Sequence, residues 1–238
     1  MNKLTWVIII ISFIIFGLLV NFYSQKDNSK LQVITIPKET LINSKKELVL
    51  IRPSVRFEVH TLPHLLSKSN CISLCQDALP YLSASKIYNV DQEYQHLIRS
   101  STSCSIVSSE SEKVRLMASK LSGYPLSNVE NAQVVRYEEG EGFDDHYDTD
   151  PTNKNNPSWS RIATFMIYLN EECIGGETEF TVIQKMIQPK TGTGVFWWNV
   201  IGDEIIPECK HKGRFVIAGT KWIINTWVHS IAIQDLKN

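Results

Sequence analysis

The sequence predicts an α+β domain with a β core, in which helices come first and strands follow. Two segments in the first half have the apolar spacing of helices, whereas short runs rich in Val, Ile, Thr and aromatic residues fill the second half. Turn-forming residues separate these runs, which is typical of a β-sandwich or a barrel. With 238 residues, of which 43% are hydrophobic, the chain has room for one domain with a sizeable core.

The N-terminal segment has a different composition from the rest. Residues Leu4–Phe22 carry no charge and lie between Lys3 and Lys26. A helix needs about 20 apolar residues to cross a bilayer, whereas the apolar region of a signal peptide has only about 7–15. We therefore expect an uncleaved transmembrane anchor over residues 1–25 with single-pass type II topology. A cleaved signal peptide is the alternative.

The composition after the anchor indicates where the domain begins and which partners it can have. Residues 26–47 are polar and rich in Lys and Ser, which predicts a stalk, and residues 48–238 form the expected domain. The formal net charge of -1 shows no excess of basic residues, and nucleic-acid-binding domains usually have one, so no nucleic-acid partner is expected. The five cysteines form no paired C-x-x-C pattern of a zinc site, and a disulfide between Cys173 and Cys209 stays open.

The expected elements follow from periodicity and from breaker residues. A helix is predicted over Leu62–Leu82, with Ser67 or Ser69 as its N-cap, and a second over Glu112–Leu121, which Gly123 and Pro125 end. The predicted strands are Ala132–Tyr137, Ile162–Leu169, Thr178–Phe180, Gly194–Trp198, Phe215–Ile217 and Trp222–Val228.

A short motif in the strand-rich half has metal-binding chemistry. His146 and Asp148 are separated by one residue, and in a strand such residues point to the same face. A His-x-Asp triplet is common by chance, so a third ligand is needed. Downstream of Asp148 the chain has two histidines, His211 and His229. Two histidines and one carboxylate form the ligand set of non-haem Fe(II) oxygenases. His229 ends the last apolar strand, where a surface or core histidine is expected, so His211 is preferred because of the residues that follow it.

These residues resemble the catalytic domain of prolyl 4-hydroxylases. The resemblance rests first on His146-Tyr147-Asp148, then on His211, and then on Lys221, which comes ten residues later with Trp222 beside it. It covers about residues 52–230. It extends to Arg99-Ser100-Ser101, Ala132–Tyr137, Gly140–Phe143, Arg161–Thr164, Tyr168–Asn170, Gly175–Phe180, Pro189, Gly192 and Phe196.

The resemblance implies a fold, a cofactor set and a catalytic centre. The fold would be a double-stranded β-helix (jelly roll) with N-terminal supporting helices. The enzyme would be a dioxygenase that uses Fe(II), 2-oxoglutarate, O2 and L-ascorbate, and that releases succinate and CO2. Its catalytic residues would be His146, Asp148 and His211, which hold the iron, and Lys221, which pairs with the far carboxylate of 2-oxoglutarate. Tyr137 matches a tyrosine that donates to the same carboxylate, and Thr178 is a third candidate.

The resemblance also implies a substrate and a location. The substrate would be a proline-rich polypeptide, hydroxylated at proline as procollagen is, and bound by Arg161, Tyr147 and Trp227, with Trp159 as a further aromatic wall. The domain is expected in the lumen of the endoplasmic reticulum, and a homo-oligomer or an accessory subunit stays open. Two alternatives are a hydroxylase of another side chain such as lysine, and a jelly-roll binding module without catalysis. The intact ligand set and Lys221 argue against the second.

Overall fold

The computed structural model describes residues 32–35, 48–54, 56–86, 98–153 and 158–237. The chain divides into two compact units, and the description below concerns the unit Val33–Asn238. Among the residues described, no helix is both long enough and apolar enough to cross a membrane. The expected anchor over residues 1–25 lies outside the described residues, and the expected stalk over 26–47 contains the described strand β1 (Gln32–Thr35).

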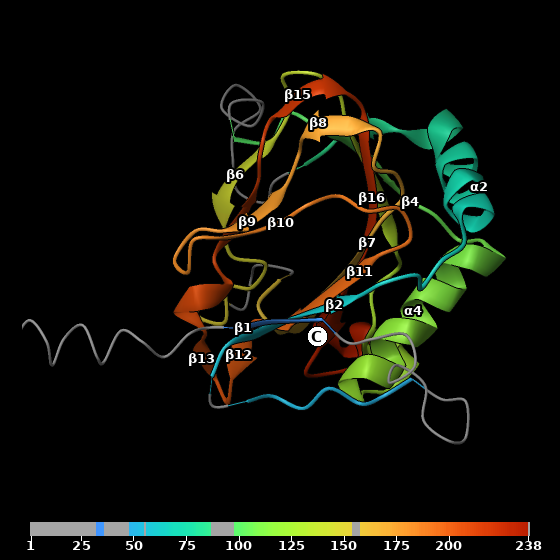
Figure 1. The fold of residues 1–238 in the computed structure, drawn as a ribbon. Coiled ribbons are helices and arrows are strands. Elements are labelled where there is room, and N and C mark those ends of the chain that lie inside the picture. Colours follow the sequence, from blue (N-terminus) through green and yellow to red (C-terminus); the bar gives the residue numbers. More distant parts are fainter. Residues whose placement is uncertain (1–31, 36–47, 55, 87–97, 154–157, 238) are drawn as a thin grey trace, which may run out of the picture. The chain divides into compact units, whose positions relative to one another are not determined.

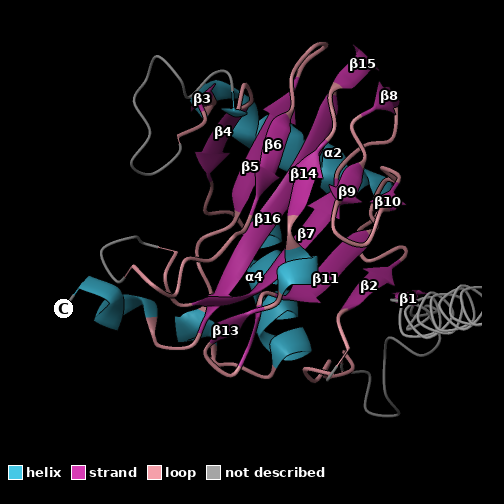
Figure 2. Cartoon of the chain, turned by 90° about the vertical axis from the view of Figure 1, so that its left-hand side faces the viewer, coloured by secondary structure: helices cyan, strands magenta, loops and turns pink. Residues whose placement is uncertain are grey.

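A large sheet forms the centre of the domain, and every pairing described in it is antiparallel (Figure 2). Its long central strands β7 and β16 match two of the predicted runs, with β16 extended to His229. The strand order is β1 (Gln32–Thr35), β2 (Glu58–Leu62), β11 (Gly194–Trp198), β7 (Arg161–Tyr168), β16 (Lys221–His229), β5 (Gln133–Tyr137), β4 (Thr102–Ser105) and β3 (Ser83–Ala84).

A smaller sheet lies against one face of the large one (Figure 1). Its order is β10 (Lys185–Ile187), β9 (Thr178–Phe180), β14 (His211–Gly213) and β6 (Phe143–His146). Two ribbons complete the strands: β12 (Val200–Ile201) with β13 (Glu204–Ile205), and β15 (Val216–Gly219) with β8 (Cys173–Gly175). The domain is therefore mostly β with few helices, in agreement with the expected jelly roll.

Two α-helices, α2 (Lys68–Ala78) and α4 (Ser109–Ser122), pack on the other face of the large sheet (Figure 1). Ser67, one of the two predicted N-caps, caps α2 by accepting a hydrogen bond from the backbone N–H of Asn70. Gly123, with a φ of 77°, ends α4 where the sequence predicts a stop. The short 3-10 helices are η1 (Leu79–Tyr81), η2 (Leu126–Asn128), η3 (Pro207–Cys209) and η4 (Ile233–Lys237).

The first predicted helix, Leu62–Leu82, is too long at both ends. Leu62 ends strand β2 and pairs with Gly194 of β11, so sheet pairing takes this residue from the helix. At the other end α2 stops at Ala78, and Pro80, which has no N–H to donate, lies in the 3-10 turn η1. The predicted strand Phe215–Ile217 is shifted as well, because β15 covers Val216–Gly219.

An aromatic cluster joins the two sheets and leads to the functional site. Phe180 of β9 packs edge-on against Trp197 of β11, with ring centroids 5.2 Å apart. Trp197 also meets the imidazole of His211 at 5.0 Å. All three side chains are buried, so the core between the sheets fixes the position of one predicted metal ligand.

Candidate metal centre and active site

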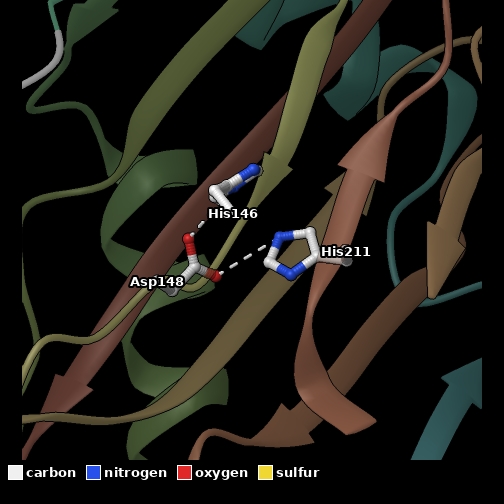
Figure 3. A group of neighbouring side chains, drawn as sticks. All are labelled: His146, Asp148 and His211. Carbon is white, nitrogen blue, oxygen red and sulfur yellow. Dashed lines mark ion pairs between the residues drawn. The ribbon is translucent and has the colours of Figure 1, made fainter. Parts of the chain in front are cut away.

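The smaller sheet brings the three predicted metal ligands together. His146 is the last residue of β6 and His211 is the first of β14, and the two are direct partners in the antiparallel register. One ligand atom from each of His146, Asp148 and His211 lies within 4.8 Å of the others. Figure 3 shows the Asp148 carboxylate facing both imidazoles: Oδ1 lies 3.6 Å from Nε2 of His146, and Oδ2 lies 3.6 Å from Nε2 of His211.

Asp148 reaches this position in a different way from the one predicted. Strand β6 ends at His146, and Asp148 lies in the bend that follows it. Strand alternation therefore does not align the two side chains; the turn of the chain after β6 does. Asp144 and Asp145 belong to β6, and their exposed carboxylates lie outside the ligand cluster.

Backbone carbonyls orient both imidazoles. The Nδ1 of His146 lies 2.7 Å from the carbonyl oxygen of Asp144, and the Nδ1 of His211 lies 2.9 Å from that of Cys209. Because a carbonyl can only accept, each Nδ1 carries the hydrogen and each Nε2 keeps its lone pair. Both lone pairs belong to the nitrogens that face Asp148, which is the arrangement that a bound cation needs.

Asp148 is buried and anchored by a polar pair. Thr164 donates a hydrogen bond of 2.7 Å to its Oδ2, and Asn199 donates one of 3.0 Å to the hydroxyl of Thr164. Burial alone would raise the pKa of Asp148, but its interactions with His211 and His146 and the Thr164 hydrogen bond outweigh this effect and lower that pKa. The carboxylate is therefore ionised at neutral pH.

The electrostatics of His211 also favour a metal ligand. Burial, followed by the neighbouring His146, lowers the pKa of His211 to about 4, against the smaller opposing effect of Asp148. The imidazole is thus neutral near pH 7 and ready to coordinate. Two imidazoles and one carboxylate form a donor set suited to Fe(II) that leaves coordination positions open.

A cavity opens from these ligands towards a buried ammonium group. Lys221, the first residue of β16, lines the same cavity as His146, Asp148 and His211, and its side chain is only 2% exposed. Burial lowers the pKa of Lys221 to about 8. Among the residues described, no carboxylate lies within ion-pair distance of its Nζ, and the nearest aromatic contact is the Tyr137 ring at 5.0 Å.

Tyr137 and Thr178 line this cavity, as their predicted role requires. Tyr137 on β5 pairs in register with Lys221, and both side chains are buried. Thr178 on β9 accepts a hydrogen bond of 2.7 Å from the hydroxyl of Tyr168. The cavity therefore combines an open metal-ligand set with a cation and hydroxyl groups.

Comparisons with known proteins agree with this geometry. Residues 132–229 match the profile of the 2OG-Fe(II) oxygenase superfamily. The chain is 30% identical to human prolyl 4-hydroxylase subunit alpha-1 over 125 residues, which cover 49% of this chain and 23% of the subunit. It is also similar to a solved structure, the viral collagen prolyl hydroxylase vCPH from Paramecium bursaria Chlorella virus-1 in its 2OG complex. The TM-score is 0.55 and the identity 26%, over 73% of this chain and 96% of the viral one.

The chain carries a prolyl hydroxylase-like 2OG-Fe(II) oxygenase domain. It spans about a quarter of the length of human subunit alpha-1, because the match covers 23% of that subunit. A third relative supports the fold of the oxygenase domain. It is a prolyl hydroxylase from Trichoplax adhaerens in complex with a hypoxia inducible factor peptide fragment. The TM-score is 0.56 at 18% identity, and the match covers 76% of this chain and 87% of that one.

Two of the predicted substrate residues lie together in the oxygenase domain. Arg161 stacks on Trp227, with its guanidinium carbon 3.8 Å from the ring centroid, and Trp227 lines the metal cavity. Glu130 holds Arg161 by two hydrogen bonds of 2.6 and 3.0 Å. The same carboxylate lies 2.6 Å from Nε2 of His229. Glu130 thus fixes the wall that Arg161 and Trp227 form.

The other predicted aromatic walls are placed less centrally. Tyr147 is 37% exposed and donates a hydrogen bond of 3.4 Å to the carbonyl of Pro207, outside the cavity lining. Trp159 is half-buried and does not line the metal cavity either. His229 is a fully buried core residue held by Ser160 and Glu130, and a core position is one of the two that the sequence predicts for it. All five cysteines are free, so Cys173 and Cys209 form no disulfide.

The structure adds site residues that the sequence analysis did not assign. Thr164 and Asn199 hold Asp148, Glu130 holds Arg161, and Arg99 lies over the Phe143 ring at 4.9 Å in the lining of the cavity. The sequence does indicate a role for Thr164, because this polar residue stands between apolar neighbours in the buried strand β7. Glu130 lies outside the predicted strands and offered no such signal.

Proposed function

We propose that this chain hydroxylates prolyl residues of a proline-rich polypeptide in a reaction that depends on Fe(II), O2 and 2-oxoglutarate. The observation that carries the proposal is the buried Lys221 ammonium in the cavity of the ligand triad. A buried cation is costly unless an anion pairs with it. A dicarboxylate such as 2-oxoglutarate would supply that anion, because one of its carboxylates would pair with Lys221.

The donor set fits an iron ion without rearrangement of its polar contacts. His146 and His211 present Nε2 lone pairs, because their Nδ1 atoms are engaged by backbone carbonyls, and Asp148 supplies the carboxylate. When bound, Fe(II) would supply the redox chemistry that couples decarboxylation of 2-oxoglutarate, to succinate and CO2, with oxygen insertion into a C–H bond.

The residues of this chain would bind and position the co-substrate. Lys221 would pair with the far carboxylate, and Tyr137 and Thr178 would donate hydrogen bonds to it. Trp197, buried beside His211, excludes water from the apolar side of the site. Low water content strengthens each of these charge interactions.

The prolyl substrate is supported by the relatives and by the wall of the cavity. The viral structure is named a collagen prolyl hydroxylase, and it matches this chain at 26% identity. Trp227 lines the cavity and its ring is held by the Arg161 stack, and aromatic-lined grooves are what polyproline segments bind. We include Tyr147 in the proposed substrate site as an exposed aromatic side chain next to the metal ligands.

We also propose the cellular setting from the sequence. The uncharged run Leu4–Phe22 supports a single-pass type II anchor in the endoplasmic reticulum membrane, with the oxygenase domain in the lumen. L-ascorbate is the proposed reductant that keeps the iron in its ferrous state. Protease protection of the domain in sealed microsomes tests the topology, because a cytoplasmic domain would be digested.

The function is tested with the full chain, Fe(II), ascorbate and 2-oxoglutarate on a panel of proline-rich peptides. Mass spectrometry should report a gain of one oxygen on proline, in step with succinate release. Both signals should disappear in Asp148→Ala, which removes a ligand. Oxidation of lysine instead would assign another side chain, and iron binding without succinate or peptide oxidation would favour a silent binding module.

A further inference from the structure

A second cavity adjoins the metal cavity, which His146, Asp148, His211 and Lys221 line, and it is larger. It has a volume of about 690 Å³, and five apolar side chains line it: Ile98, Phe143, Met186, Phe215 and Ile217. We refer to it as the apolar groove. Phe215 and Ile217 are each 67% exposed, and Met186 is 54% exposed. Large apolar side chains that are exposed together and line a hollow mark a binding surface.

The groove is continuous with the catalytic cavity through two residues. Phe143 and Gly213 line both hollows and are partners in the register of β6 with β14. The Phe143 ring stacks on the imidazole of His146, with centroids 3.6 Å apart. The groove therefore begins one aromatic ring away from a proposed metal ligand.

Two glycines, which have no side chain, lie where the groove meets the metal cavity. A Cβ added at Gly213 would lie 3.7 Å from Nζ of Lys221 and 3.8 Å from Cβ of Phe143. A Cβ at Gly142, on the groove side, would come within 3.1 Å of the Phe215 ring. Any larger residue at these positions would fill the space that joins the groove to the cavity.

The groove is also lined by four charged residues, Asp144, Glu177, Lys212 and Arg214, and both cations among them are paired. Arg214 donates to Glu179 at 2.9 Å and lies 3.6 Å from Glu177, and Lys212 lies 3.7 Å from Glu179. The Asp144 carboxylate at the rim accepts the backbone N–H of Asp145 at 2.8 Å. The groove thus offers apolar contact rather than a site for an anionic ligand.

We infer that the apolar groove binds bulky apolar residues of the polypeptide substrate that flank the hydroxylated residue. The occupant is the substrate chain because the groove opens into the cavity where the reacting residue must lie, so one extended polypeptide can fill both. This inference rests on the proposed function and narrows it. The preferred substrate is a proline-containing polypeptide with Leu, Ile or Phe in its flanks, and a pure repeat of Pro with small residues is a poorer one.

The test compares two peptides that share a central proline and differ in their flanks, with Leu and Phe in one and Ser and Gln in the other. Fluorescence anisotropy with the full chain, Fe(II) and 2-oxoglutarate under anaerobic conditions measures binding apart from turnover. The apolar-flanked peptide should bind about 10-fold more tightly or better, because apolar contacts in such sites are worth about 10–200-fold.

Exposed side chains allow matched variants. The double variant Phe215→Ser, Ile217→Ser should lose the preference between the two peptides. Ile174→Ser is the control, because Ile174 is 63% exposed on strand β8, which pairs with β15, yet does not line the groove. Equal binding of the two peptides to the unsubstituted chain would overturn the inference. So would a preference that survives in the double variant or is lost equally in Ile174→Ser.

Hydroxylation of the same peptides separates this inference from the proposed function. Tighter binding of the apolar-flanked peptide without oxidised proline would keep the groove and refute prolyl hydroxylation. Equal hydroxylation of both peptides, together with equal binding, would keep the proposed function and refute the groove.

Discussion

Replacing Lys221 by Met separates the effect of the buried ammonium on stability from its effect on the binding of 2-oxoglutarate. Methionine has a similar length but no charge, so the side chain still fills the end of the cavity. The structure predicts opposite effects on two quantities: the unliganded protein becomes more stable, and the affinity for 2-oxoglutarate falls.

The gain in stability follows from the pKa of Lys221. Burial lowers it from 10.5 to about 8, and such a drop corresponds to about 3 kcal/mol against the charged, folded form. Because the folded pKa lies below the unfolded one, this cost is fully present below pH 8 and fades as the pH rises towards 10.5. At pH 7 the Lys221→Met variant should therefore unfold at higher urea concentration than the wild type, and the difference should shrink above pH 8.

The loss of affinity follows from the missing ion pair. Removing one partner of a buried charge pair costs about 3–5 kcal/mol, so the Kd of 2-oxoglutarate should rise by about 100-fold or more. In the wild type the affinity should fall as the pH rises above about 8, since the free amine then loses its charge. Lys221→Met should lack this pH dependence.

Lys212→Met is the matched control, because Lys212 pairs with Glu179 and does not line the metal cavity. Anaerobic calorimetry with Fe(II) measures the affinity, and urea unfolding measures the stability. The reasoning is refuted if Lys221→Met binds 2-oxoglutarate within threefold of the wild type. It is equally refuted if the unliganded variant is less stable at pH 7.

Three further predictions concern the neighbours of the cavity. Asp148→Asn should weaken Fe(II) binding by about 100-fold or more, since it removes the only anionic ligand of the triad; an unchanged iron content after dialysis would contradict this. Thr164→Val should weaken Fe(II) binding by about 10-fold, because it frees Oδ2 of Asp148, and titration of Fe(II) against each variant measures it. Glu130→Gln should lower the free energy of unfolding by about 2 kcal/mol, a value that is reduced because the ion pair of Glu130 with Arg161 is partly exposed. The same variant should raise the KM for the peptide and leave the KM for 2-oxoglutarate unchanged, because Glu130 holds Arg161 against Trp227. An unchanged KM for peptide would remove Arg161 from the substrate site.

The sequence by itself located the features that depend on local pattern. Strands β9 and β11 have the predicted bounds, and Ser67 and Gly123 mark helix ends as expected. These predictions hold because a cap, a left-handed glycine or an alternation of side chains acts within a few residues. The ligand set His146, Asp148 and His211 was found because its spacing resembles that of a known family.

Tertiary structure alone decided how the site is held together. The register of β14 on β6 places His211 opposite His146, and no periodicity in a three-residue strand encodes its partner. The same holds for Thr164 at Asp148 and for Glu130 at Arg161, which are distant in sequence and meet only across packed strands. Local sequence determines which residues carry the chemistry, whereas non-local strand pairing and burial determine which of them touch and what charge each can bear.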